Sequence, residues 1–273
     1  MEHILIIQDI NLLQQLKNKS IVAETDNIEM IEQINNAVQS DNNLFCIKLR
    51  INQDITSITF KEEWQGIPLV IYPDSLGLVR NLIGLLPVIK KLNVKFFLDG
   101  AMEQNYEAVQ ILSSLGIYSG IVINENTDWE KLTDLMYYAL CGKIPHAPIE
   151  PFQYVFDMYQ RNTLVDYDTV FFNNPAKFLY VGSDGQVALS KQNLEQKNFL
   201  LSKIKKINEL EDNKNYQQYI KSWQKFFYEP TQCAACAGWR ICLGKYSYLK
   251  DKKLCQEFTF DLLNIIENQK FKK

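Results

Sequence analysis

The sequence predicts an α/β fold, in which a partial or degenerate βα barrel precedes a small cysteine-rich module. Short runs rich in β-branched and aromatic residues alternate with helical patterns, which is typical of βα units around a parallel sheet. About five or six such units are expected, fewer than an eight-fold barrel needs. The pattern changes after residues 143–151, which hold three of the eight prolines.

Six strands are expected in the first half of the chain. Each is a short apolar run bounded by polar or turn-forming residues. In order they are HILII (3–7), SIVAE (20–24), LFCIKLR (44–50), IPLVIY (67–72), VKFFL (94–98) and IYSGIVI (117–123). Their alternation with helical segments favours parallel pairing.

Helices are expected between these strands. Asp26 is expected to cap the helix in DNIEMIEQINNAVQS, whose isoleucines share one face. The next helix runs from Asp74 to about Lys91, and Gly84 and Pro87 are expected to kink it or end it early.

Helical patterns continue along the rest of the chain. EQNYEAVQILSSLG is expected to end at Gly116, and Asp128 is expected to cap WEKLTDLMYYALCG. Residues 194–228 have mostly helical patterns, and FTFDLLNIIENQK is expected to form a closing helix.

The proline-rich segment predicts a domain boundary. We expect a βα domain over residues 1–150 and a cysteine-rich domain over residues 151–273. Early in the second domain, FLYVGSDGQVALS (178–190) predicts a hairpin, because Asp184-Gly185 supplies the turn between two strands.

Composition excludes several classes of function. The net charge is −3 and no basic cluster points to nucleic acid or to a membrane surface. No apolar stretch approaches the length of a membrane span, and the N-terminus does not resemble a signal peptide. We therefore expect a cytoplasmic protein, whose thiols stay reduced and available to a metal.

The densest chemical pattern is a group of four cysteines near the C-terminus. Cys233, Cys236, Cys242 and Cys255 form the pattern C-x2-C-x5-C-x12-C. The first pair places two sulfurs on one turn, and the other two cysteines complete a set of four thiolates. An iron–sulfur cluster fits four cysteines with uneven spacing. Structural zinc and buried free thiols remain the alternatives.

These residues carry a family resemblance. The spacing C-x2-C-x5-C with a more distant cysteine resembles the C-terminal half of a SPASM domain, and the hairpin in 178–190 resembles the SPASM hairpin. Such domains follow radical SAM barrels in peptide-modifying enzymes and hold auxiliary [4Fe–4S] clusters. The resemblance covers roughly residues 90–260 and is specific at 233–244. It implies that the four cysteines ligate one auxiliary cluster.

The chain also departs from that family. It lacks the C-x3-C-x2-C motif of radical SAM enzymes, since Cys46 is the only cysteine before Cys141. No GGE-like segment is present, the hairpin lacks its flanking cysteines, and Tyr246 stands where the family usually has another cysteine. Without its hairpin cysteines, one of the two auxiliary clusters is expected to be lost. Without the C-x3-C-x2-C motif, no radical SAM activity is expected.

The resemblance then implies an accessory protein that assists maturation of a ribosomally made peptide. Its partners would be a precursor peptide or a peptide-modifying enzyme such as an ATP-grasp ligase. The alternatives are a single-cluster redox or electron-transfer protein and a zinc-stabilised interaction module. We assign no catalytic residue. His146 lies between two prolines and is expected to be a loop histidine, and common hydrolase and nucleotide-binding motifs are lacking.

Overall fold

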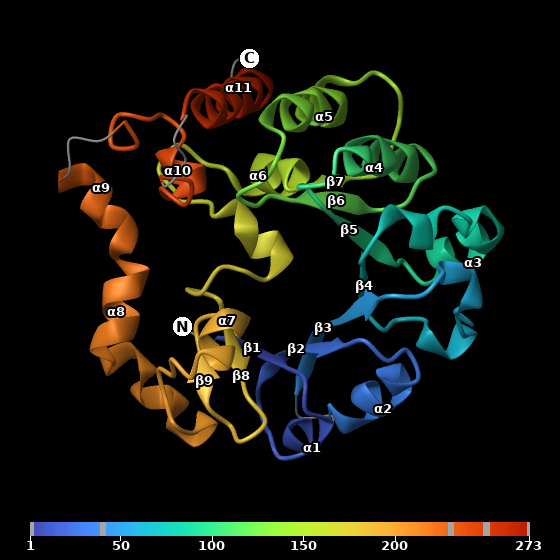
Figure 1. Cartoon of the computed structure of the whole chain (residues 1–273). Coiled ribbons are helices and arrows are strands. Elements are labelled where there is room, and N and C mark those ends of the chain that lie inside the picture. The colour runs from blue at the N-terminus through green and yellow to red at the C-terminus, as the bar shows by residue number, and fades with distance from the viewer. Residues whose placement is uncertain (1–2, 39–41, 229–231, 248–251, 272–273) are drawn as a thin grey trace. The chain divides into compact units, whose positions relative to one another are not determined.

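The computed structural model describes residues 3–38, 42–228, 232–247 and 252–271 (Figure 1). It has a nine-stranded sheet of hydrogen-bonded order β7-β6-β5-β4-β3-β2-β1-β8-β9. The strands are β1 (Ile4–Ile7), β2 (Ser20–Thr25), β3 (Asn43–Ile51), β4 (Leu69–Pro73), β5 (Lys95–Asp99), β6 (Ser119–Val122), β7 (Ile149–Glu150), β8 (Phe178–Val181) and β9 (Val187–Ala188). The α/β class is thereby confirmed.

The α-helices differ widely in length. They are α1 (Ile10–Leu13), α2 (Met30–Ala37), α3 (Leu86–Lys91), α4 (Gln104–Ser114), α5 (Trp129–Cys141), α6 (Phe152–Met158), α7 (Lys191–Glu195), α8 (Lys214–Ile220), α9 (Lys225–Tyr228), α10 (Trp239–Cys242) and α11 (Lys253–Lys270). None of the helices in the described part of the chain is long and apolar enough to cross a bilayer.

The chain divides into two compact units, neither of which is one continuous segment. Unit 1 comprises residues 1–97 and 172–220, and unit 2 comprises residues 98–171 and 221–273. Each unit therefore joins early and late parts of the sequence. The division into residues 1–150 and 151–273 stays a prediction.

Unit 1 is built on parallel strands. β2 pairs with both β1 and β3, β3 pairs with β4, and β8 pairs with β1, all in parallel. Strand β1 and the centre of β2, residues 21–23, are made of buried apolar residues, as expected when both faces of a parallel sheet are covered. Figure 1 shows α1 and α2 beside β1 to β3.

The predicted hairpin forms, and its first strand also belongs to the parallel sheet. β9 pairs antiparallel with β8, with Tyr180 opposite Ala188. Gly185 has a φ of +81° in the turn, a conformation that glycine adopts without steric cost. Because β8 is buried and pairs with β1, the hairpin extends the sheet of unit 1.

Unit 2 contains β6, β7 and the helices that carry the cysteines. β7 pairs in parallel with β6 through Ser119 and Ile149, within the segment that the prolines predicted to be a boundary. The long helix α11 lies beside α5 (Figure 1). Asp128 caps α5 as predicted, since its side chain accepts from the backbone N–H groups of Glu130 and Lys131.

Two expected helices differ from the structure. Asp26 is not a cap, because α2 starts at Met30 after a turn in which the Asn27 side chain accepts from the backbone N–H of Glu29. The helix expected over 74–91 is replaced by two 3-10 segments, 76–79 and 82–85, followed by α3. Pro87 stands in the first turn of α3, where its missing N–H costs nothing.

Candidate metal centre

The four cysteines of the C-terminal segment line one cavity in unit 2. Cys233 and Cys236 lie in turns before α10, Cys242 is the last residue of α10, and Cys255 lies in the first turn of α11. All four are half-buried. The cavity has about 520 Å³ of empty space, part of it open to solvent, and we call it the thiol cavity.

The turn after α10 folds the chain back on Cys242. Leu243 and Gly244 both have a positive φ, of 52° and 72°, which reverses the chain at once after Cys242. As a result, the backbone N–H of Lys245 donates to the carbonyl of Cys242 over 3.2 Å. Burial raises the pKa of Cys242, and the nearby backbone N–H groups of Gly244, Lys245 and Tyr246 oppose that rise.

A close helix contact positions the turn that carries the other pair. The backbone N–H of Cys236 donates to the carbonyl of Cys233 over 3.2 Å, which closes that turn. At Gly238, a Cβ atom would lie 2.3 Å from Oγ1 of Thr259 on α11, so a larger residue cannot fit without a shift. Thr259 Oγ1 is also 3.9 Å from Cys236 Sγ.

Cys255 brings the fourth sulfur from the start of α11. Its thiol donates to the backbone carbonyl of Lys252 over 3.2 Å. Burial and the three neighbouring thiols raise the pKa of Cys255 to about 12, and burial also raises the pKa of Cys233. Without a cation these thiols stay protonated at neutral pH, so binding a metal would release protons.

A polar brace holds the loop after Cys242. Lys245 Nζ lies 2.5 Å from Asp166 Oδ1 and 2.8 Å from Asp168 Oδ2. Burial alone lowers the pKa of Lys245, but the two carboxylates raise it overall. The backbone N–H of Val165 also donates to the carbonyl of Arg240 over 2.9 Å. These contacts attach the cysteine loop to a segment some 80 residues earlier.

Aromatic rings pack against the same loop through Tyr246. Tyr246 stacks on Tyr167 with ring centroids 6.1 Å apart, and it meets Trp129 edge-on at 5.1 Å. Trp129 in turn contacts Phe258 of α11 at 5.6 Å. Tyr246 is therefore a buried packing residue.

The donor chemistry of the thiol cavity fits a soft metal centre. Among the described residues that line it, the metal-binding side chains are the four thiols, which suit iron–sulfur clusters and zinc. Their present arrangement is not yet a metal site. Within the described ranges, no three His, Cys, Asp or Glu side chains converge as a metal ion requires. Binding would have to draw the sulfurs together across the cavity.

The remaining residues considered from the sequence, Cys46, Cys141 and His146, lie outside the thiol cavity. Cys46 is buried in β3 of unit 1, where burial raises its pKa to about 12, and Cys141 is exposed at the end of α5. The ring of His146 stacks on Tyr138 at 4.9 Å and its Nδ1 lies 3.1 Å from the Ser113 hydroxyl. These contacts are what a packed loop histidine makes.

Sequence reasoning did not identify the brace. Asp166 and Asp168 stand two residues apart in VDYDTV, a signal for paired carboxylates, but nothing local connects them to Lys245. Comparison of the chain with protein-family models, curated proteins and solved structures found no match.

Proposed function

We propose that the thiol cavity holds one metal centre, a [4Fe–4S] cluster ligated by Cys233, Cys236, Cys242 and Cys255. The supporting observation is that four thiols line one cavity, where the backbone N–H groups after α10 also favour the thiolate form of Cys242. Hydrogen bonds to sulfur stabilise thiolate charge and help to set the potential of a cluster.

The chain's own residues would prepare this centre. The left-handed pair Leu243-Gly244 aims the donors, and the brace from Lys245 to Asp166 fixes the loop that carries them. When bound, the cluster would supply either structural cross-linking of the segment or one-electron transfer. The apolar ring of Tyr246 would limit access of water from its side of the cavity.

We further propose an accessory role in the maturation of a ribosomally made peptide, without radical SAM activity. The support is the resemblance of residues 233–244 to a SPASM module, in a chain without the cysteine triad that radical SAM chemistry needs. In this proposal the strands of the first half form a partial βα barrel. The partner is a precursor peptide or a peptide-modifying enzyme of the ATP-grasp kind.

The metal content tests the first proposal. We expect protein purified without oxygen to be brown and to hold about four iron and four sulfide per chain. Cys242→Ser should lose most of the iron, whereas Cys141→Ser, which changes an exposed cysteine at the end of α5, should retain it. One zinc ion per chain, with no iron, would instead favour a zinc-stabilised interaction module. If Cys242→Ser kept all of its iron or zinc, both the cluster and the zinc hypothesis would be contradicted.

Two further assays test the accessory role. Iron-loaded protein mixed with S-adenosylmethionine and a reductant should yield no 5′-deoxyadenosine, and its formation would sink the proposal. Expression with the genes that neighbour its own should co-purify a short peptide or a peptide-modifying enzyme. Reversible reduction coupled to turnover of a separate redox partner would favour an electron-transfer protein instead.

A further inference from the structure

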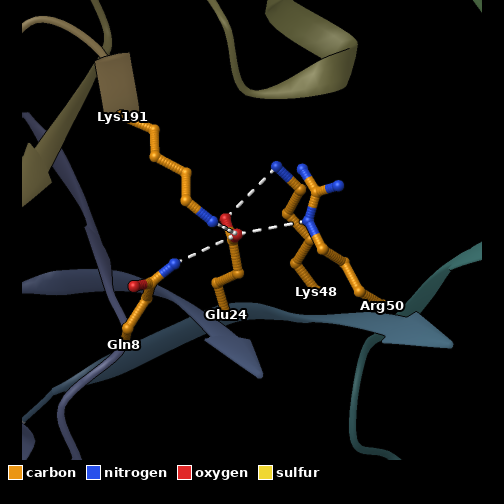
Figure 2. Close-up of polar contacts among 5 residues, drawn as sticks. All are labelled: Gln8, Glu24, Lys48, Arg50 and Lys191. Carbon is orange, nitrogen blue, oxygen red and sulfur yellow. Dashed lines mark hydrogen bonds and ion pairs between the residues drawn. The ribbon is translucent and has the colours of Figure 1, made fainter. Parts of the chain in front are cut away.

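A second polar group lies in unit 1, near the carboxyl ends of its parallel strands. It consists of Gln8, Glu24, Lys48, Arg50 and Lys191, and we call it the cationic cluster (Figure 2). Glu24 is the penultimate residue of β2, and Arg50 is the penultimate residue of β3. Glu24 pairs in register with Lys48, and Lys48 and Arg50 share a face because strand side chains alternate. Open and closed parallel sheets place their ligand sites at this end.

Glu24 is the centre of the cluster. Its Oε1 accepts from Gln8 Nε2 at 3.2 Å, Arg50 Nε at 3.3 Å and Lys191 Nζ at 3.2 Å. Its Oε2 lies 3.4 Å from Lys48 Nζ. Figure 2 shows Lys48 and Arg50 approaching from one side, and Gln8 and Lys191 from the other. Each of these contacts is longer than the ~2.8 Å of a strong charge-assisted bond.

Positive charge exceeds negative charge in this cluster. Three cations surround one carboxylate, and the Glu24–Lys48 pair is buried, with side chains 3% and 4% exposed. Arg50 and Lys191 are 47% and 43% exposed, so the cluster has a buried floor and an accessible rim. Arg50 uses its Nε on Glu24, and its two terminal nitrogens have no partner among the described residues. Those nitrogens belong to the guanidinium group, which binds one oxyanion through two parallel hydrogen bonds.

A buried hydroxyl beside the cluster also lacks a partner. Tyr72 of β4 stands opposite Arg50 in the register, and its ring centroid lies 4.9 Å from Lys48 Nζ. The Tyr72 hydroxyl oxygen is buried and makes no hydrogen bond within the described residues. Burial raises the pKa of Tyr72, so its hydroxyl remains a donor at neutral pH. A buried donor without an acceptor is uncommon, because leaving it unpaired costs free energy.

We propose that the cationic cluster and Tyr72 form a binding site for one oxyanion, the carboxylate or phosphate group of a small ligand. Arg50 and Lys191 supply the rim charges, the Tyr72 hydroxyl donates from the wall, and Lys48 supplies charge from the floor. Glu24 holds the three cations in place and keeps Lys48 charged in a buried position. The site belongs to unit 1 and does not depend on the proposed metal centre.

Direct titration tests this site. Full-length protein is titrated calorimetrically with inorganic phosphate and, separately, with succinate, with ionic strength held constant by sodium chloride. We expect one saturable site for at least one probe, and the preferred probe identifies phosphate or carboxylate as the natural group. Arg50→Gln should weaken binding by about tenfold, the usual loss for a charge-assisted bond. Arg80→Gln, an identical change at an exposed position of the same unit, should have no effect.

Tyr72→Phe provides an independent variant that removes one oxygen atom. It should weaken binding several-fold while the circular dichroism spectrum and thermal midpoint stay close to those of the unchanged protein, because the lost hydroxyl makes no internal hydrogen bond. Absence of saturable binding of both probes would overturn the proposal. Equal binding by the Arg50→Gln and Arg80→Gln variants would overturn it as well.

Discussion

The thiol cavity of unit 2 and the cationic cluster of unit 1 are built in opposite ways. The four thiols lie within 23 residues, on turns and on the ends of helices. The cluster gathers side chains from residue 8 to residue 191, mostly from adjacent strands whose register sets their spacing. The backbone hydrogen bonds between strands hold the residues of the cationic cluster in place, whereas the turns that carry the thiols are held by side-chain contacts. The Lys245 brace is one such contact.

The two regions also treat buried carboxylates differently. Burial raises the pKa of Glu24, but Lys48, Lys191 and Arg50 together lower it below its usual value. Burial likewise raises the pKa of Asp166, and there the rise persists, because Lys245 opposes it while the neighbouring Asp168 carboxylate adds to it. The charges around each buried carboxylate therefore decide the sign of the shift.

The largest expected effect is from Glu24→Met. The change leaves Lys48 buried without its carboxylate, which should cost about 3–5 kcal/mol of unfolding free energy. Urea unfolding measures this, and the double variant Glu24→Met/Lys48→Met should recover much of the loss. Glu62→Met breaks the exposed pair with Lys91 and should change stability little. Equal losses for Glu24→Met and Glu62→Met would remove the distinction between a buried cluster and a surface pair.

Lys245→Met tests the brace of unit 2. We expect a smaller loss of about 2–3 kcal/mol, because Asp166 can relieve its unpaired burial by taking up a proton. The matched control is Lys131→Met, which breaks an exposed pair with Glu103 and should leave the urea midpoint unchanged. Iron content measured on the same samples should fall with Lys245→Met. A stable, fully loaded variant would show that the brace is dispensable.

Gly238→Ala probes the packing of the cysteine turn on α11. The new methyl group would overlap Thr259, which should cost about 1–3 kcal/mol, the usual range for overpacking. Gly84→Ala is the control, since a Cβ there meets nothing within 4 Å, and it should be neutral or slightly stabilising. Thermal unfolding of both variants would separate the two cases, and an equal response would contradict the close contact.

The smallest effect concerns pH. Because the folded pKa of Glu24 is lowered, its contribution to stability is complete above about pH 4.5, the unfolded value, and is lost as the pH falls through the folded pKa. The difference in unfolding free energy between the unchanged protein and Glu24→Gln should therefore shrink as the pH falls below about 4.5. A difference independent of pH would mean that the carboxylate does not titrate with folding.

The sequence predicted most of the parallel strands, because each is a short apolar run with its own local signal. Strands β1 to β6 begin and end within two residues of the predicted ranges. β7 was not predicted, since two residues in a proline-rich segment carry no periodicity. The closing helix starts at Lys253, earlier than the apolar run predicted, so Cys255 lies on the helix rather than on a loop.

By itself, the sequence determined the class of fold and the set of four thiols, since both are written in the identity and spacing of nearby residues. The tertiary structure decided which distant residues share a polar site. Glu24 meets Lys191, and Lys245 meets Asp166, because strand register and loop packing bring them together. Neither meeting has a signal in the local sequence. The physical reason is that burial is encoded residue by residue, whereas a charge pair exists only after two segments have packed.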